Sequence, residues 1–314
     1  MSPSSFTHPA SARRAPRTGR TAALVTAGAT VALTVVACSA TDPDDDNLAG
    51  TGDTTPTVSA EQSGPTYGRY VALGDSFAAL GPVDAPTSGP AACLRSSLNY
   101  PALVSAGDPI GELVDVTCGG ARTLDMTTRQ IPETPPQFDA LTPDTDLVTL
   151  SIGGNDIGFG AIAGCVAQTP RAAPGAPCRD RLEQSVTDAL NALPASLDTV
   201  YAGIADRSPA ARVIATAYMP LVPDHGGCEF VSGMSPGDVT WVRHVTERIN
   251  LIVADAADRA GATVAEPDDA DQHHACAPAS ERYTDFTGTE TGSHPMHPTA
   301  AGQQAMAEAV SAVL

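Results

Sequence analysis

The chain has few positive charges and few aromatic side chains, and each shortage excludes a class of partner. Lysine and arginine together number 17 against 36 acidic residues, so the formal net charge of the 314-residue chain is −19. No basic cluster occurs outside the extreme amino terminus, which excludes the phosphate-binding face that nucleic acid requires. Aromatic residues make up only 4% of the chain and offer no obvious stacking platform for sugars.

Paired-cysteine zinc motifs are also missing, because the chain contains no Cys-x-x-Cys pair. One run, Asp271-Gln272-His273-His274-Ala275-Cys276, does contain side chains that can bind zinc. We favour a polar loop with a disulfide-bonded cysteine there, since no second pair of ligands accompanies the run. The sequence therefore predicts no metal site.

The amino terminus has the pattern of an export signal, because arginines precede an uncharged stretch, residues 21–37. The end of this stretch, Val35-Val36-Ala37-Cys38, resembles a bacterial lipobox, which would make Cys38 the lipidated first residue of the mature protein. The alternative is an odd cysteine beside a conventional cleavage site. A retained membrane helix is disfavoured, since the stretch is short and rich in small residues. Residues 1–37 are thus predicted to direct export, as a cell-surface lipoprotein or a secreted protein.

Residues 38–66 are expected to form a disordered tether. They combine a run of aspartates with Gly, Thr, Ser and Pro and have almost no apolar content, so they cannot bury enough surface to fold. The aspartate run lacks the glycine and the downstream glutamate of a calcium loop, which favours a solvated spacer. Residues 67–314 remain for one folded domain.

In this domain, short apolar runs alternate with longer helical patterns. The alternation predicts an α/β fold, a three-layer α/β/α sandwich around a five-stranded parallel sheet of flavodoxin-like order 2-1-3-4-5. The expected strands are 69–74, 113–117, 146–152, 211–217 and 262–266, and the expected helices are 98–106, 121–130, 180–205, 237–260 and 299–313.

Six cysteines follow Cys38, and an even set in an exported chain predicts three disulfides. The predicted strand order places two pairs on loops that follow neighbouring strands. The third pair lies in a proline-rich segment after the third strand, where we expect an irregular loop closed by a local bridge. The favoured pairs are Cys93 with Cys118, Cys228 with Cys276, and Cys165 with Cys178.

Ser76 is the candidate nucleophile. It lies in the run Gly74-Asp75-Ser76-Phe77, directly after the first strand, and open α/β sheets bind ligands at the carboxyl ends of their strands. A free serine is a poor nucleophile, so this assignment requires a base and an oxyanion site elsewhere in the chain. Asp75 and, in a later turn, Asp156 are expected to brace their own turns through Asx-type hydrogen bonds.

Two glycine-rich turns at the same edge of the sheet can supply oxyanion donors. Gly120 lies in a turn after the second strand, where backbone N–H groups are exposed. Asn155 follows the third strand, in Gly153-Gly154-Asn155-Asp156, and adds a side-chain amide. With the N–H of Ser76, three donors are expected to converge, although Gly-Gly-Asn-Asp alone is also an ordinary turn sequence.

His297 is the candidate base, because it precedes the last predicted helix and so lies at the edge of the sheet that holds Ser76. A histidine in a polar loop is more often a surface residue than a catalyst. Its assignment therefore depends on whether the fold brings it within hydrogen-bond reach of the serine.

These motifs occur in the order of the four signature blocks of the SGNH (GDSL-type) hydrolases, which the chain resembles over residues 67–314. The start around the nucleophile and the cysteine pattern are similar to those of secreted actinobacterial lipases and esterases. The resemblance implies a hydrolase without metal or other cofactor. Its implied site comprises Ser76 as nucleophile, His297 as base, and Ser76, Gly120 and Asn155 as oxyanion donors.

One position departs from the family pattern. Many members carry an aspartate three residues before the histidine, and this chain has His294 there. Some relatives use a main-chain carbonyl instead, so we expect the carbonyl of His294 or a close neighbour to orient His297. A remote carboxylate is the alternative, with Asp271, Asp285 and Glu290 all available.

The resemblance implies a serine carboxylic ester hydrolase, a lipase or esterase, that acts on a small-molecule or lipid ester. We expect a monomer, although no motif determines the oligomeric state. A carbohydrate O-deacetylase with the same catalytic residues is the alternative. A non-catalytic binding lipoprotein is disfavoured, because every block is intact. No lid segment is identifiable, which favours an accessible cleft, and the sequence leaves the acyl and alcohol specificity open.

Overall fold

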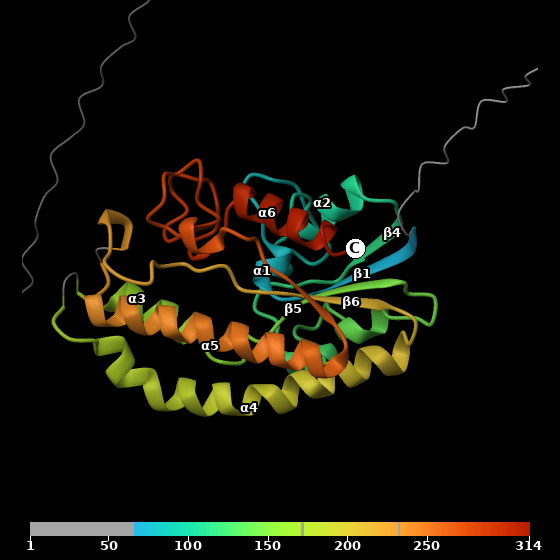
Figure 1. Ribbon diagram of the computed structural model, residues 1–314, viewed down its shortest axis with the longest axis horizontal. Coiled ribbons are helices and arrows are strands. Elements are labelled where there is room, and N and C mark those ends of the chain that lie inside the picture. The colour runs from blue at the N-terminus through green and yellow to red at the C-terminus, as the bar shows by residue number, and fades with distance from the viewer. Residues whose placement is uncertain (1–65, 171–172, 232) are drawn as a thin grey trace, which may run out of the picture. The chain divides into compact units, whose positions relative to one another are not determined.

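A computed structural model describes residues 66–314 except 171, 172 and 232 (Figure 1). The predicted export signal, Cys38 and nearly all of the predicted tether lie outside these residues. Among the helices that are described, none is long and apolar enough to cross a bilayer.

A five-stranded parallel sheet forms the centre of the domain, as predicted. Its order is β4-β1-β5-β6-β7, which is the predicted order 2-1-3-4-5 when these five strands are counted along the chain. Each strand lies within a few residues of its predicted position. The strands are β1 (Tyr67–Gly74), β4 (Ile110–Asp115), β5 (Leu147–Ser151), β6 (Arg212–Thr216) and β7 (Thr263–Ala265).

Helices cover both faces of the sheet and complete the predicted three-layer sandwich. On one face lie α4 (Pro177–Arg207) and α5 (Pro236–Ala260), which run below the sheet in Figure 1. On the other face lie α2 (Tyr100–Gly107) and α6 (Ala300–Ser311).

Alternate side chains of β1 enter two separate hydrophobic cores. Val71 and Leu73 belong to the core beneath α4 and α5, whereas Tyr70 and Ala72 belong to the core beneath α2 and α6. Successive side chains of a strand point to opposite faces, so a sheet that is covered on both faces needs apolar residues at nearly every position. This is why the central strands β1 and β5 are readable in the sequence as apolar runs, whereas the edge strand β4 has exposed residues at Gly111 and Glu112.

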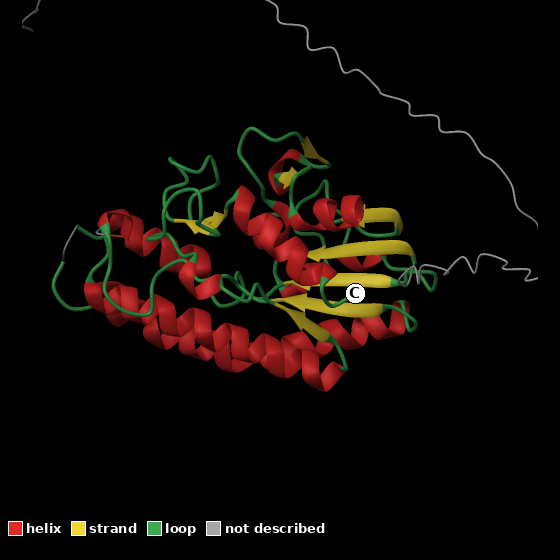
Figure 2. Cartoon of the chain, turned by 45° about the horizontal axis from the view of Figure 1, so that its top comes forward, coloured by secondary structure: helices red, strands yellow, loops and turns green. Residues whose placement is uncertain are grey.

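The remaining elements are short and lie in the connecting segments (Figure 2). They include the one-turn helix that begins at the candidate nucleophile. The α-helices and strands among them are α1 (Ser76–Ala79), α3 (Phe159–Gln168), β2 (Thr87–Ser88), β3 (Arg95–Ser96), β8 (Thr284–Asp285) and β9 (His297–Pro298). The 3₁₀ helices are Ala91–Cys93, Thr123–Met126, Gln137–Ala140, Glu229–Val231 and Ala270–Gln272.

The helix predicted over residues 121–130 is wrong. Only the 3₁₀ turn Thr123–Met126 forms there. The N–H and hydroxyl of Thr123 bond the carboxylate of Asp156, and two later threonine hydroxyls bond the Leu124 carbonyl. Side-chain bonds of this kind compete with helical ones, so the segment forms a loop fastened to its neighbour.

The segment after β5 is more regular than predicted, because α3 forms where an irregular loop was expected. Cys165 lies inside α3 and Cys178 in the first turn of α4, so their disulfide joins two helices. Of the prolines that argued against regular structure, Pro170 and Pro174 lie between the helices. Pro177 is the first residue of α4, a position where proline is well tolerated.

All three disulfides join the predicted pairs. Two of them fasten loops at the carboxyl edge of the sheet, between neighbouring strands. The bonds are Cys93–Cys118, Cys165–Cys178 and Cys228–Cys276.

Candidate active site

Ser76 follows β1 directly, so the end of the strand sets its position. Gly74 allows the bend there: its φ is +148°, and a Cβ would lie 2.6 Å from the Ser151 carbonyl oxygen of β5. A larger residue would force the two strands apart. Asp75 then caps α1 by accepting the Phe77 N–H at 2.9 Å, which is the Asx-type bond expected for it.

His297 meets Ser76 although 221 residues separate them in sequence. Its Nε2 lies 2.8 Å from Ser76 Oγ, and its Nδ1 lies 2.7 Å from the Pro295 carbonyl oxygen. A carbonyl only accepts hydrogen bonds, so Nδ1 carries the proton and Nε2 is left to accept from the serine hydroxyl. This tautomer is the one that a general base for Ser76 requires.

The surroundings of His297 favour its neutral form. Burial lowers the pKa of His297 below its ordinary value of 6.5, the bond to the Pro295 carbonyl raises it, and the nearby His294 lowers it. The rings of Phe77 and Phe159 pack beside the imidazole, with centroids 5.7 and 6.4 Å from its own. A neutral imidazole can accept the proton of the serine.

The carbonyl bonded to His297 Nδ1 belongs to Pro295, a close neighbour of His294, which the prediction included. The His294 carbonyl instead accepts the backbone N–H of His297 at 3.2 Å. A sequence motif cannot identify this carbonyl, because every residue has a backbone carbonyl. The three remote carboxylates are engaged by guanidinium groups: Asp285 and Glu290 by Arg282, and Asp271 by Arg243.

Asn155 lies beside Ser76, since both line one pocket. Its Nδ2 donates to the Ala121 carbonyl at 3.0 Å, and a primary amide has a second hydrogen that can meet a bound oxyanion. Gly120 precedes Ala121, is exposed and has a φ of +80°. Gly120 is not among the described residues that line the pocket, and it is joined to the site through the Ala121 bond.

Asp156 reaches across to a neighbouring loop, which the expected Asx-type turn did not include. Its carboxylate accepts the Thr123 N–H at 3.0 Å and the Thr123 hydroxyl at 2.5 Å. Together with the bond between Asn155 and Ala121, this contact fastens the Gly120 turn to the loop that follows β5.

Tyr218 was not predicted as a site residue. Its hydroxyl donates to Asp75 Oδ2 at 2.6 Å and accepts the Gly154 N–H at 2.8 Å. One hydroxyl therefore links the turn of Ser76 to the turn of Asn155. A usable signal was its place just after the fourth predicted strand, at the edge where the other site residues gather.

The partner of this hydroxyl is a buried carboxyl group. Burial raises the pKa of Asp75 from 3.8 to about 7, although the bonds from Tyr218 and Phe77 lower it. Burial and the charge of Asp75 also hold the pKa of Tyr218 well above its ordinary value. The Tyr218 hydroxyl therefore stays protonated and donates a hydrogen bond to Asp75.

An apolar pocket opens beside Ser76, and the empty space in and above it, open solvent included, is about 530 Å³. One wall is a single face of α5, whose lining residues recur at helical spacing. The lining from α5 comprises Val242, Val245, Thr246 and Ile249, and the other apolar lining comprises Phe77, Ile157, Phe159, Tyr218, Met219 and Leu221. Such a lining suits the hydrocarbon part of a ligand.

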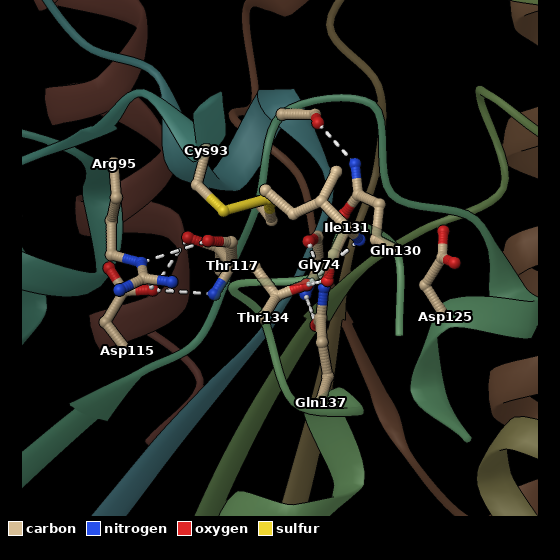
Figure 3. Close-up of a disulfide and its surroundings, with 12 residues drawn as sticks. Gly74, Cys93, Arg95, Asp115, Thr117, Asp125, Gln130, Ile131, Thr134 and Gln137 are labelled. Atoms are coloured by element: carbon tan, nitrogen blue, oxygen red, sulfur yellow. Dashed lines mark hydrogen bonds and ion pairs between the residues drawn. A yellow bond between two sulfur atoms is a disulfide. The ribbon is translucent and has the colours of Figure 1, made fainter. Parts of the chain in front are cut away.

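A disulfide and a glutamine brace the edge of the sheet behind the nucleophile turn (Figure 3). Cys118 is bonded to Cys93, and the Gly119 N–H donates to the Cys93 carbonyl at 2.9 Å. Gln137 exchanges two hydrogen bonds with the backbone of Gly74, at 2.8 and 2.9 Å. The disulfide thus joins the segments that follow β1 and β4, and Gln137 holds the end of β1.

Residues 271–276, the run with potential zinc ligands, make structural contacts. Asp271 forms an ion pair with Arg243, Cys276 is disulfide-bonded, and the ring of His273 stacks on that of Tyr283. Over residues 66–314, outside the three undescribed positions, no group of three His, Cys, Asp or Glu side chains is arranged to hold a metal ion.

Comparison with known proteins identifies the family. A model of the GDSL-like lipase/acylhydrolase family matches residues 72–305, which include Ser76 and His297. The chain is 38% identical over 274 residues to Lipase 2 of Streptomyces coelicolor, covering 84% of this chain and 92% of the relative.

Two solved structures share the fold. The extracellular lipase of Streptomyces rimosus is 26% identical, with a TM-score of 0.65 over 79% of this chain and 100% of its own. Phospholipase A1 of Streptomyces albidoflavus NA297 is 27% identical, with a TM-score of 0.63 over 79% of this chain and 99% of its own. The chain therefore belongs to the GDSL-like lipase/acylhydrolase family, the SGNH hydrolases that its motifs resemble, and it is a carboxylic ester hydrolase.

Proposed function

We propose that the enzyme hydrolyses esters through an acyl-enzyme formed on Ser76. His297 takes the hydroxyl proton on Nε2 while Oγ attacks the ester carbonyl carbon. The Ser76 and Gly120 N–H groups and the Asn155 amide stabilise the charge that develops on the carbonyl oxygen. His297 then gives the proton to the leaving alcohol, and water releases the acid by the same steps.

The observation that carries this proposal is the pair of hydrogen bonds made by His297. The 2.8 Å contact of Nε2 with Ser76 Oγ supplies the base, and the 2.7 Å contact of Nδ1 with the Pro295 carbonyl orients it. A protein that only binds ligands has no need of this arrangement.

Replacement of the nucleophile tests the mechanism. S76A should abolish hydrolysis of a nitrophenyl ester and labelling by a fluorophosphonate while thermal unfolding stays close to wild type. The matched control is Ser185→Ala, since Ser185 lies exposed on α4. Wild-type turnover in S76A would overturn the assignment of Ser76. A wild-type protein that neither labels nor hydrolyses would favour a binding function.

We propose an ester with an extended acyl chain as the substrate, because the pocket beside Ser76 is lined by apolar side chains. The names of the relatives, which include lipases and a phospholipase A1, support the same class. Across nitrophenyl esters from acetyl to palmitoyl, kcat/KM should rise beyond acetyl. A maximum at acetyl, together with turnover of acetylated glycans, would favour the O-deacetylase instead.

We also propose that the enzyme is exported and lipidated on Cys38. The pattern of residues 1–37 supports export, and the S. rimosus relative is an extracellular lipase. Expressed as the full chain in a bacterial host, the wild type should fractionate with membranes and C38S should not. Wild-type enzyme in the medium, with no lipid mass on Cys38, would favour secretion after ordinary cleavage.

A further inference from the structure

Met296, one residue before the candidate base, has a left-handed backbone with a φ of +61°. Only one other non-glycine residue of the described part of the chain has a positive φ, Leu94. This conformation is costly for a residue with a Cβ, and it persists only where the surroundings hold it. Its position beside His297 therefore calls for a functional explanation.

The left-handed residue belongs to a tight turn. The His297 N–H donates to the His294 carbonyl at 3.2 Å, which makes Pro295 and Met296 the two central residues. Proline at the first central position and a positive φ at the second define a type II turn. In a type I turn the peptide group between these two residues is turned over, so its carbonyl points the opposite way.

That central peptide group is the one that contacts the base. Its carbonyl, from Pro295, accepts from His297 Nδ1 at 2.7 Å, and its N–H, from Met296, donates to the backbone carbonyl of buried Asp285 at 2.8 Å. Asp285 and His297 are also paired between β8 and β9. Both bonds depend on one orientation of the peptide group, and a turned-over peptide would lose both.

We propose that Met296 is a positioning residue for the base: its left-handed backbone directs the Pro295 carbonyl to Nδ1 of His297. The inference rests on the proposed function, in which His297 is the base. Residue 296 must tolerate a positive φ, and its side chain is secondary. Glycine meets this requirement without cost, straight-chain residues meet it at some cost, and β-branched residues meet it poorly.

Uncharged substitutions of Met296 leave the charges near His297 unchanged. The imidazole contacts Ser76 Oγ, the Pro295 carbonyl and the rings of Phe77 and Phe159, and His294 is the nearby group whose charge lowers its pKa. The carboxyl of Asp75, beneath the nucleophile, is held by Tyr218 and the Phe77 N–H.

The experiment compares M296V with M296A. Alanine removes more of the side chain, which packs against the larger core, whereas valine keeps more volume but is β-branched. We expect M296A to keep kcat/KM within about threefold of wild type and M296V to lose about tenfold or more. The acid limb of the M296V pH profile should move to lower pH, because the Pro295 carbonyl that raises the pKa of His297 is lost. Should M296V fail to fold, M296T replaces it.

M296G separates the backbone from the side chain, and its kcat/KM should be at least that of M296A. The inference is overturned if M296V matches or exceeds M296A, if the acid limb stays in place, or if M296G falls well below M296A. These outcomes are distinct from failure of the proposed function, in which S76A keeps its activity or the wild type hydrolyses no ester.

Discussion

Two buried polar side chains hold the turn that carries Ser76. Tyr218 bonds Asp75 from one side, and its own backbone exchanges two hydrogen bonds with Asn250 of α5. On the other side, the fully buried Gln303 of α6 donates to the carbonyls of Phe77 and Leu80. Helices from both faces of the sheet thus reach the Ser76 turn, α6 directly through Gln303 and α5 through Asn250 and Tyr218.

Tyr218→Phe removes one hydroxyl and keeps the ring against Phe77. We expect kcat to fall about tenfold with little change in KM, because the Gly154 N–H and the Asp75 carboxyl each lose a buried partner. Steady-state kinetics measure the effect. Tyr201→Phe, at a buried tyrosine of α4 outside the pocket, is the control and should leave kcat unchanged. A Y218F enzyme with wild-type kcat would contradict a positioning role.

Asn155→Ala removes the only side-chain donor among the proposed oxyanion groups. The loss of one such donor costs about a hundredfold or more in kcat, since the charge it stabilises exists only near the transition state. KM should change little. Asn191→Ala, at an exposed asparagine of α4, is the control. An unaltered kcat in N155A would exclude Asn155 from the oxyanion site.

At the scale of elements, the loops after β1, β4 and β5 form one connected unit. The Cys93–Cys118 bond joins the first two, and the contacts of Asn155 with Ala121 and of Asp156 with Thr123 join the last two. Buried apolar side chains of these loops, such as Met126 and Ile157, pack into the larger core, and the covalent and polar links between the loops add to the rigidity that a preorganised site requires.

The double variant C93S/C118S should therefore lose both stability and activity. Opening this bridge, which spans 25 positions, should lower the free energy of unfolding by about 3 kcal/mol on the chain-entropy model. At temperatures where the variant is still folded, its kcat should also be lower than that of wild type, because the Gly120 turn is loosened.

The matched control is C165S/C178S, whose bridge joins α3 to α4. It should lose comparable stability and keep its kcat. Denaturant unfolding and kinetics at low temperature distinguish the two effects, and an equal loss of kcat in both variants would argue against a special role for the first bridge.

At the scale of the whole domain, Asp75 couples folding to pH. The native domain releases this proton near pH 7 and the unfolded chain near pH 3.8. Because the folded state binds the proton more tightly, Asp75 favours folding at low pH, and this contribution is lost as the pH rises from 3.8 to about 7.

Asp75→Asn removes this titration and keeps the shape of the side chain. The stability of D75N relative to wild type should increase between pH 4 and pH 7, by up to about 1.4 kcal/mol for each pH unit, and then level off. Thermal or denaturant unfolding across this pH range measures the trend. A difference in stability that the amide introduces equally at every pH does not affect it. A difference that stays constant with pH would show that Asp75 is already ionised in the acidic native domain.

Local patterns were sufficient for the framework of the domain. The central strands β1 and β5 were visible because nearly all of their residues are buried, and two of the three cysteine pairs followed once the strand order was known. The same patterns failed at residues 121–130, where the apparent helix is overridden by the bond between Thr123 and Asp156. They also failed at α3, which forms where nearby prolines suggested a loop.

The sequence by itself determined the strand order, the family and the turns on which Ser76, Asn155 and His297 lie, because these follow from hydrophobic runs and from motifs a few residues long. Only the tertiary structure decided that the Pro295 carbonyl accepts a hydrogen bond from His297 Nδ1 and that Tyr218 binds Asp75, 143 residues away. The physical reason is the same in both cases. Every residue has a backbone carbonyl, so the sequence does not show which one will bond the histidine. A contact between distant turns forms only when the sheet has aligned the ends of its strands.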